Sequence, residues 1–314
     1  MKITVVIPCY RSEQTLGPLV DELVEVLPAL AGVDGHEVVL VDDGSPDRAG
    51  AVVDELAARH PSVRGVHLRR NYGQHNAIVA GIRQASGDLI VTMDDDGQHR
   101  PDQIGTLIAP LLEDPLLDLV YGIPSVEEHG PVRSLASRLV KWALRRVGVA
   151  NAEWVGAFRA FRTDLRAAFV AALGAEVNVD VVLSWGTNRV AAARVVMDRR
   201  TVGRSNYSFA RLASHAFTMV TGYTALPLRL ASIVGFLAAA IGIALSVIVV
   251  VQYSVGATTV AGFTSTIAAI SLFSGAQLFS IGMIGEYLGR QHFRAMHKPM
   301  YLIRTDPDAH DDVA

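Results

Sequence analysis

Three consecutive carboxylates stand out in the run Thr92-Met93-Asp94-Asp95-Asp96-Gly97-Gln98. In an extended segment, residues two apart face the same side, so Asp94 and Asp96, with Gln98, are expected to converge on one point while Asp95 faces elsewhere. Neighbouring carboxylates repel each other unless a cation or hydrogen-bond donors neutralise them. Mg²⁺ takes one or two protein carboxylates together with substrate phosphate oxygens. The run therefore predicts a site for a divalent metal and a diphosphate, although an exposed acidic turn is the alternative.

Three further loops have a similarly polar composition. Residues 8–13, 42–46 and 69–74 combine carboxylates, amides and cations, and each follows a short apolar run. Turn chemistry explains any one of them, since Asp-Gly-Ser is a common turn and helix-start signal. The occurrence of four such loops favours a shared binding rim instead.

The segments between these loops predict alternating strands and helices. Short β-branched runs predict strands at residues 3–7, 38–41, 63–68, 89–93 and 117–121. Apolar residues at helical spacing predict helices within 16–30, 52–57, 78–82 and 104–112. This alternation is typical of βαβ units in an α/β fold with a mostly parallel sheet, in which ligands bind beyond the carboxyl ends of the strands.

The middle of the chain is less regular. Strands are predicted at residues 155–161 and 190–197 with a helix at 164–173 between them, and amphipathic helices at 133–147 and 211–223. The net charge of −3 excludes a global basic field, so we expect no nucleic-acid partner. The single cysteine, Cys9, excludes an internal disulfide framework and a cysteine-based zinc cluster.

The chain is unusually apolar, and the excess lies in one block. Of its 314 residues, 50% are hydrophobic and 19% charged, against about 25% charged in ordinary soluble domains. Residues 230–285 contain no Asp, Glu, Lys, Arg or His. The block is long enough for two membrane crossings of about 20 residues each, expected at about 230–253 and 260–285. A buried soluble hairpin is the alternative, but such helices normally carry a polar face.

Basic residues flank this block on both sides and are absent from its central turn. The positive-inside rule therefore predicts that both flanks face the cytoplasm. The first residues, 1–7, are too short and too strand-like for a signal-peptide core. We accordingly expect a multi-pass protein of the inner (cytoplasmic) membrane, with the N-terminal domain and both termini in the cytoplasm.

Taken together, these segments resemble glycosyltransferase family 2, and within it the polyprenyl-phosphate glycosyltransferases (dolichol-phosphate mannose synthase-like and bactoprenol glucosyltransferase-like). The matching segments occur in family order and span almost the whole chain. They are Val6-Ile7-Pro8-Cys9-Tyr10, Val41-Asp42-Asp43-Gly44-Ser45, and residues 71–77, 87–88, 93–99, 156–159, 200–208, 226–229 and 285–290.

The resemblance implies a GT-A-type nucleotide-sugar domain followed by the transmembrane hairpin. The expected organisation is a catalytic domain at 1–210, a juxtamembrane amphipathic segment at 211–229, two membrane helices within 230–289, and a cytoplasmic tail at 290–314.

The resemblance also implies roles for individual residues. Asp94 and Asp96 match the Asp-x-Asp motif for Mg²⁺ or Mn²⁺, with Gln98 as a third ligand. Arg200 and Ser205 lie in the segment expected to close over donor and acceptor, and are assigned to catalysis with the two aspartates. The residues implied in nucleotide binding are Pro8, Tyr10, Glu13, Asp42, Asp43, Asn71, Gly73 and Asp95.

Two assignments concern the substrates. Asp43 matches the acid that accepts a nucleobase N–H, a group that both uracil and guanine possess, so the donor is expected to be UDP- or GDP-linked. The family often has an arginine after the fifth strand, where this sequence continues into Pro124. The acceptor phosphate is therefore assigned to a wider set of candidates, Arg133, Ser137, Arg138 and Arg159.

Two further departures from the family pattern affect the donor side. Gly97 stands where the family usually has a bulky apolar residue, so a more mobile metal loop is expected. Asn206 replaces the usual lysine before Tyr207, which removes one cation near the diphosphate.

The predicted activity is inverting transfer of a sugar from a nucleoside diphosphate sugar to polyprenyl phosphate. The acceptor phosphate is ionised near neutral pH, so Glu176 or Asp180 would be needed as a base only for a hydroxyl acceptor. The alternatives are a family 2 transferase acting on a saccharide or protein hydroxyl, and a non-catalytic nucleotide-binding membrane scaffold. The apolar block favours the lipid, and the Asp94, Asp96 and Gln98 set argues against the scaffold. The resemblance and the small residues in the block also predict a homo-oligomer.

Overall fold

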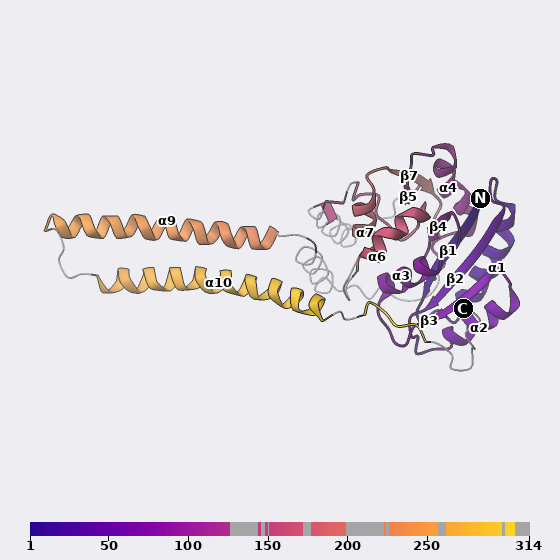
Figure 1. The fold of residues 1–314 in the computed structure, drawn as a ribbon, viewed down its shortest axis with the longest axis horizontal. Helices are drawn as coiled ribbons and strands as arrows, with labels where there is room; N and C mark the ends of the chain where they lie inside the picture. Colours follow the sequence, from indigo (N-terminus) through magenta and orange to yellow (C-terminus); the bar gives the residue numbers. More distant parts are fainter. Residues whose placement is uncertain are drawn as a thin grey trace. The chain divides into compact units, whose positions relative to one another are not determined.

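The computed structural model describes residues 1–125, 144–145, 148–149, 151–171, 177–198, 223, 226–256, 262–296 and 299–304. The chain divides into two compact units (Figure 1). Met1–Leu212 together with His297–Ala314 form the first, and Ala213–Met296 form the second.

The first unit is built on a sheet that, within the described residues, has seven strands in the order β3-β2-β1-β4-β6-β5-β7. Strand β6 runs antiparallel to its neighbours β4 and β5, and the other neighbouring pairs are parallel. The predicted mostly parallel α/β sheet is therefore confirmed. The strands are β1 (Lys2–Cys9), β2 (Gly35–Asp42), β3 (Val63–His67), β4 (Leu89–Thr92), β5 (Leu119–Pro124), β6 (Arg159–Arg162) and β7 (Val190–Val195).

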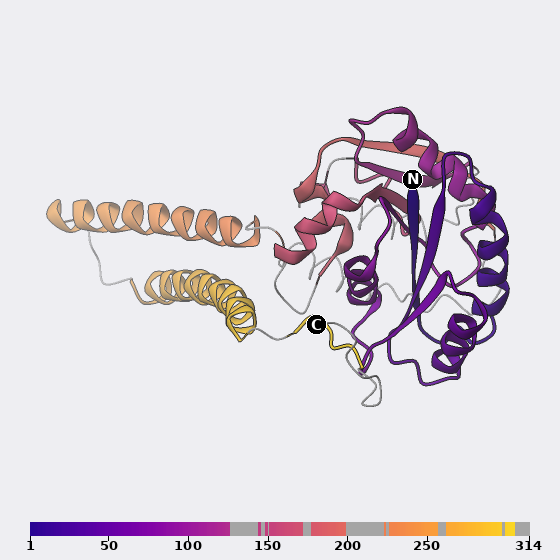
Figure 2. The same cartoon turned by 45° about the vertical axis from the view of Figure 1, so that its right-hand side comes forward.

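Helices cover both faces of this sheet (Figure 2). Successive side chains of a strand point to opposite faces. In β1, Val5 and Ile7 pack in one apolar layer with α1, α2 and α4, whereas Val6 packs in the other with α3, α6 and α7. Burial on both faces explains why the central strands read as continuous apolar runs. The helices are α1 (Leu16–Val26), η1 (Leu27–Ala29), α2 (Ala49–Arg59), α3 (Gln74–Gln84), η2 (Pro101–Gln103), α4 (Ile104–Glu113), η3 (Thr163–Leu165), α6 (Arg166–Ala171) and α7 (Val179–Gly186).

Helix α7 is the described element that the sequence reading missed. It is eight residues long and rich in β-branched residues, which favour strands. Its start is set by Asn178, whose side-chain oxygen accepts the backbone N–H groups of Asp180 and Val181, each at 3.1 Å. The helices predicted at 133–147 and 211–223 lie almost entirely outside the described residues.

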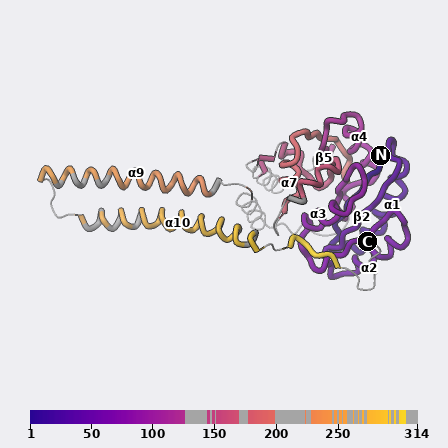
Figure 3. The backbone as a smooth tube through the Cα atoms, in the orientation of Figure 1, coloured from indigo at the N-terminus to yellow at the C-terminus, as the bar shows by residue number. Residues whose placement is uncertain are grey.

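Near its C-terminus the chain contributes to the first unit again (Figure 3). Residues 299–304 run beside the end of β3, where Ile303 forms an antiparallel bridge with Leu68. The N–H of Arg69 donates to the Leu302 carbonyl at 2.9 Å, and Met300 is buried in the layer that contains α3. The tail predicted for 290–314 therefore includes a stretch that packs on the sheet unit.

The second unit contains two long helices, α9 (Leu226–Ser254) and α10 (Phe263–Ala295), which pack against each other. Gly242 lies close to Phe273, and the Ser280 hydroxyl donates to the Ala231 carbonyl at 3.4 Å, so the two helices run antiparallel. The two-helix arrangement was predicted, with α10 continuing ten residues beyond the expected end at 285. Among the described residues, no helix combines the length and the hydropathy needed to cross a bilayer.

Candidate functional site

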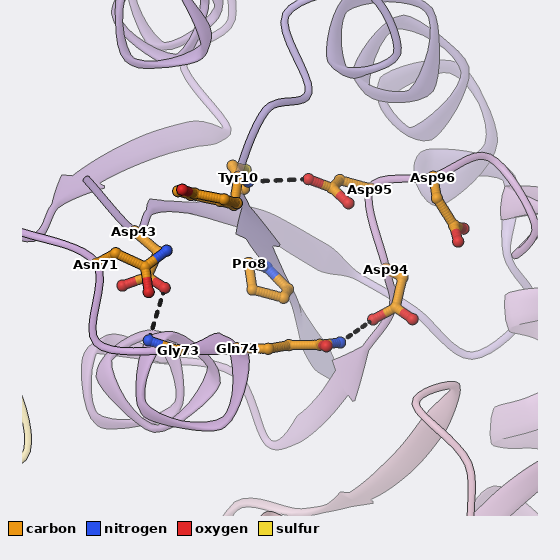
Figure 4. Close-up of a pocket in the computed structure, with 10 residues that line it drawn as sticks. Pro8, Tyr10, Asp43, Asn71, Gly73, Gln74, Asp94, Asp95 and Asp96 are labelled. Carbon is orange, nitrogen blue, oxygen red and sulfur yellow. Dashed lines mark hydrogen bonds between the residues drawn. The ribbon is translucent and has the colours of Figure 1, made fainter. Parts of the chain in front are cut away.

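A pocket lies beyond the carboxyl ends of β1, β2 and β4, beside the start of α3 (Figure 4). All four polar loops identified in the sequence contribute to it. Four of its lining side chains are aspartates, and none of the described residues that line it is Lys, Arg or His. The lining residues are Pro8, Cys9, Tyr10, Asp43, Asn71, Gly73, Gln74, Asp94, Asp95 and Asp96.

Most of the residues predicted to bind nucleotide are brought together here, whereas Glu13 and Asp42 are not part of the lining. Gln98, predicted as the third metal ligand, is not part of the lining either. Glu13 instead accepts the backbone N–H of Arg48 at 3.1 Å, from the start of α2. Gln74 also lines the pocket. The sequence assigned it no role, although it lies next to Gly73 within the matching segment 71–77. Cys9 also lines the pocket, and burial raises the pKa of its thiol well above the usual value, which makes it a poor nucleophile.

Asp43 ties the loop after β2 to the loop after β3. One carboxylate oxygen accepts the backbone N–H of Tyr72 at 2.7 Å. The other accepts that of Gly73 at 2.8 Å (Figure 4). Burial raises the pKa of this carboxyl, against the opposing effect of the two hydrogen bonds. The loops are in close contact at Gly44 as well, because a Cβ there would lie 2.5 Å from the Arg70 backbone. Glycine is therefore required at position 44, where φ is +61°.

Asp42, one residue earlier, is buried behind this loop rather than exposed in the pocket. It accepts the Ser45 N–H at 2.9 Å and pairs with His67 Nδ1 at 3.1 Å. The other ring nitrogen of His67 lies 2.8 Å from Asp54. The hydrogen bond to Asp42, followed by Asp54, raises the pKa of His67, whereas burial lowers it. Asp42 thus holds the loop after β2 from behind the pocket, and its predicted role in nucleotide binding stays a prediction.

Asp95 joins the loop after β1 to the acidic loop after β4. Its carboxylate accepts the backbone N–H of Tyr10 at 3.1 Å (Figure 4). Burial raises the pKa of Asp95 to about 6. Asp95 thus bonds the backbone of the β1 loop, although it lines the same pocket as Asp94 and Asp96.

The loop from residue 93 to residue 98, called the metal loop below, carries Asp94 and Asp96. Gln74 donates from Nε2 to the Asp94 carboxylate at 2.6 Å, and Asp96 accepts the Gln98 N–H at 3.1 Å. His99 Nδ1 accepts the Asp94 backbone N–H at 2.9 Å. Burial lowers the pKa of His99 to about 4, so the ring is neutral and that nitrogen is free of a proton.

The donor set of this loop fits a divalent cation that arrives with a diphosphate. Within the described residues, no group of three His, Cys, Asp or Glu side chains is placed to hold an ion by itself. Asp94 and Asp96 nevertheless line one pocket, and Mg²⁺ uses one or two protein carboxylates with substrate phosphates for the remaining positions. The pocket therefore suits a metal shared between protein and substrate rather than a closed protein cage.

Arg159 occupies a different place from the one predicted. It is 1% exposed, its Nε donates to the Thr92 hydroxyl at 2.9 Å, and it forms an ion pair with Asp180. Tyr121 donates its hydroxyl to the same carboxylate at 3.1 Å. Arg159 is thus unavailable to an acceptor phosphate at the surface, and Asp180, considered as a base for a hydroxyl acceptor, is buried beside it.

The remaining predicted residues fall outside the described part of the chain. They are Arg133, Ser137, Arg138, Glu176, Arg200, Ser205 and Asn206. The chain that leads to Arg200 is described up to Asp198, whose backbone N–H donates to the Gln98 carbonyl at 2.9 Å. Met197 also forms an antiparallel bridge with His99. The described chain before the segment expected to close over the substrates, at Met197 and Asp198, therefore lies beside Gln98 and His99.

Comparison with known proteins bears on the fold and the family. Glucosyl-3-phosphoglycerate synthase from Mycobacterium tuberculosis, solved with Mn²⁺, UDP and phosphoglyceric acid, superposes with a TM-score of 0.52 at 20% identity, covering 70% of this chain and 76% of that one. A second structure of that synthase, solved with Mg²⁺ and UDP, gives a TM-score of 0.50 at 20% identity, over 70% of this chain and 77% of that one. At this identity the likeness shows the fold alone, which is GT-A-like.

The sequence relatives extend over nearly the whole chain. A protein of Pseudomonas aeruginosa (strain LESB58) named undecaprenyl-phosphate 4-deoxy-4-formamido-L-arabinose transferase is 34% identical over 98% of this chain and 92% of its own length. A protein of the same name from Enterobacter sp. (strain 638) is 33% identical over 96% and 93%. The family model described as "Glycosyl transferase family 2" matches residues 4–168. On these matches, with the sheet and the acidic pocket at its strand ends, the chain belongs to glycosyl transferase family 2.

Proposed function

We propose that this enzyme transfers a sugar from a nucleoside diphosphate sugar to polyprenyl phosphate, with inversion at the anomeric carbon. The observation that carries the proposal is the pocket with four lining aspartates and, among its described lining residues, no basic side chain. Such a pocket repels a diphosphate unless a cation accompanies it. The names of the relatives, which align over most of both chains, support a polyprenyl phosphate acceptor.

The nucleotide is proposed to bind between the loops after β1, β2 and β3. Each carboxylate oxygen of Asp43 has two lone pairs, so bonds from Tyr72 and Gly73 leave capacity for a nucleobase N–H. Tyr10, 41% exposed at the pocket, offers a ring face to the base. This arrangement supports a UDP- or GDP-linked donor, and the UDP complexes of the structurally similar synthase are in keeping with the former.

Asp94 and Asp96, with Gln98 beside them, are proposed to hold Mg²⁺ or Mn²⁺. When bound, the metal neutralises negative charge on the departing nucleoside diphosphate. The protein's own contribution is positional: Gln74 orients Asp94, and Asp95 fixes the metal loop to the loop after β1. The attacking phosphate oxygen is already ionised near neutral pH, so cations that orient it are needed more than a general base.

We also propose that α9 and α10 anchor the enzyme in the inner membrane, with the catalytic unit and both termini in the cytoplasm. The proposal is based on the uncharged sequence between residues 230 and 285 and on basic residues at both of its ends. Large apolar side chains such as Phe236 and Leu278 are 84% and 69% exposed. A lipid-linked acceptor would then meet a water-soluble donor at the bilayer surface. Homo-oligomerisation remains a prediction.

The activity is tested with purified protein, polyprenyl phosphate, a panel of UDP- and GDP-sugars, and Mg²⁺ or Mn²⁺. We expect a lipid-linked sugar with one donor, and its loss on chelation or in Asp96→Ala. The matched control is Asp102→Ala, an exposed aspartate paired with Arg100 away from the pocket. Absence of lipid product with every donor, or product from a hydroxyl acceptor instead, would overturn the proposal.

The topology is tested separately by cysteine labelling in intact cells. Cys9 is buried, so we expect it to react little with the maleimide in the otherwise unchanged protein. Ser254→Cys, at the end of α9, is expected to react with an impermeant maleimide from outside, whereas Asp312→Cys should react only after permeabilisation. Labelling of both positions, or of neither, in intact cells would contradict the proposed orientation.

A further inference from the structure

A single tripeptide of the sheet unit, residues 157–159, contacts the two residues that flank the metal loop, Thr92 and His99. At the first end, Thr92 donates its hydroxyl to the Ala157 carbonyl at 2.7 Å and accepts a hydrogen bond from Arg159 Nε at 2.9 Å. At the other end, the Phe158 ring stacks on the His99 ring, with centroids 5.0 Å apart and planes 15° apart. The strand register places Thr92 directly opposite Arg159.

The guanidinium of Arg159 is itself held from a third direction. Asp180, in the first turn of α7, pairs with it, and Tyr121 of β5 donates its hydroxyl to the same carboxylate at 3.1 Å. All three side chains are buried, with exposures of 1% for Arg159 and Tyr121 and 6% for Asp180. The chain of contacts therefore runs from α7 through β6 to the last residue of β4.

Stability alone does not account for this buried ion pair. Desolvation of two charges offsets most of their attraction, and apolar replacements of similar volume are often neutral or stabilising. A directional role does account for it, because the guanidinium is a rigid planar donor that can bind Thr92 and Asp180 at once. Thr92 lies two residues before Asp94, so a shift at Thr92 displaces the carboxylate that follows.

We propose that Arg159 is a positioning residue for the metal loop, oriented by Asp180 and acting through Thr92 on Asp94 and Asp96. This inference rests on the proposed metal-assisted function and deepens it. Arg159 is buried and is not among the residues that line the pocket. It holds the strand end from which the metal-binding carboxylates project, in the way that outer residues orient the ligands of metal sites.

The decisive variant is the double substitution Arg159→Met with Asp180→Asn, which removes both charges together. The asparagine keeps an oxygen that can accept the Tyr121 hydroxyl. Three quantities are measured: thermal unfolding, UDP binding in EDTA, and Mn²⁺ binding in the presence of UDP by electron paramagnetic resonance. We expect unfolding and UDP binding in EDTA to remain close to wild type. The Mn²⁺ dissociation constant should rise about 10- to 100-fold, and Arg159→Lys should fall between, since lysine keeps the charge without the planar fork.

Two controls separate position from fold. Arg162→Met removes the other arginine of β6, whose guanidinium donates to backbone carbonyls including Leu111 and Leu117; it should lower the unfolding temperature without changing Mn²⁺ affinity. Thr92→Val should weaken Mn²⁺ binding, and Thr92→Ser should restore it. This pair keeps the test valid if the double variant fails to fold.

The outcomes are distinct. A folded double variant, or a folded Thr92→Val, with Mn²⁺ affinity within about twofold of wild type would overturn the positioning role. Equal losses of Mn²⁺ affinity in Arg162→Met would overturn it too, because the effect would then be one of general stability. If the wild type itself binds no Mn²⁺ with UDP, the proposed metal-assisted function falls first, and this inference falls with it.

Discussion

The aspartates on the two sides of the pocket are held in different ways. On the side proposed to bind nucleotide, Asp43 and Asp95 accept backbone N–H groups from loops that are distant in sequence, at Tyr72, Gly73 and Tyr10. On the metal side, Asp96 accepts an N–H from within its own loop, and Asp94 accepts a side-chain amide. Asp43 and Asp95 therefore tie the backbones of distant loops together, whereas Asp94 is linked to α3 by a side-chain amide and Asp96 is bonded within its own loop. Residues 157–159 support the metal loop through Thr92 and His99.

This difference has a physical consequence for substitutions. A backbone N–H that loses its acceptor in a partly buried place costs about 1–3 kcal/mol, so changes on the nucleotide side should lower stability and binding together. Asp96 is proposed to bind the metal and is bonded within its own loop, so its loss should reduce activity more than stability. Three measurements test this contrast.

The largest effect is expected for Asp96→Ala. Loss of a carboxylate that supports charge stabilisation in the transition state should reduce kcat by about 10²- to 10³-fold. The free energy of unfolding should fall by less than in Asp43→Ala, by about 1 kcal/mol, because one N–H, that of Gln98 in the same loop, loses this acceptor. Initial rates and thermal unfolding of the same preparation check both statements. A strong loss of stability would break the contrast between the two sides.

Asp43→Ala should have the opposite profile. It leaves the Tyr72 and Gly73 N–H groups without their acceptor, at a cost of about 1–3 kcal/mol for each N–H that stays unsatisfied. The donor KM is expected to rise together with the drop in unfolding temperature. Asp43→Asn keeps one acceptor oxygen and should lie between. An unchanged unfolding temperature in Asp43→Ala would show that the tie between these loops contributes nothing to the fold.

The smallest effect is expected in the pH dependence of the unfolding temperature, through His67 behind the loop after β2. The pKa of His67 is raised above its usual 6.5, chiefly by the hydrogen bond to Asp42. Protonated His67 therefore contributes stability that is fully present below the unfolded-state pKa and is lost as pH rises through the higher folded-state pKa. In His67→Gln, the decline of unfolding temperature with pH just above 6.5 should become shallower. Identical slopes for the variant and the wild type would show that protonation of His67 does not stabilise the fold.

Much of the sheet unit could be predicted from local patterns. The strands appear where short β-branched runs lie, and α1 follows the leucine spacing of its buried stripe. The four polar loops meet in one pocket because the carboxyl ends of parallel strands share one edge. Helix α7 was missed because its β-branched sequence favours strand, and its start depends on the Asn178 cap.

The buried position of Arg159 could not be predicted from local patterns. Its sequence context predicts only a cation near the end of a strand. Its burial depends on β6 lying antiparallel between β4 and β5 and on α7 bringing Asp180 from 21 residues away. No spacing in the sequence encodes that meeting.

The sequence by itself determined the α/β alternation, the spacing of Asp94 and Asp96, and the uncharged block at 230–285, because periodicity, side-chain chemistry and charge are local properties. Only the tertiary structure decided which carboxylates serve the fold and which stay available for chemistry. That choice depends on backbone N–H groups and buried charges from distant segments. Their free energies are realised only when the strands and loops are packed together.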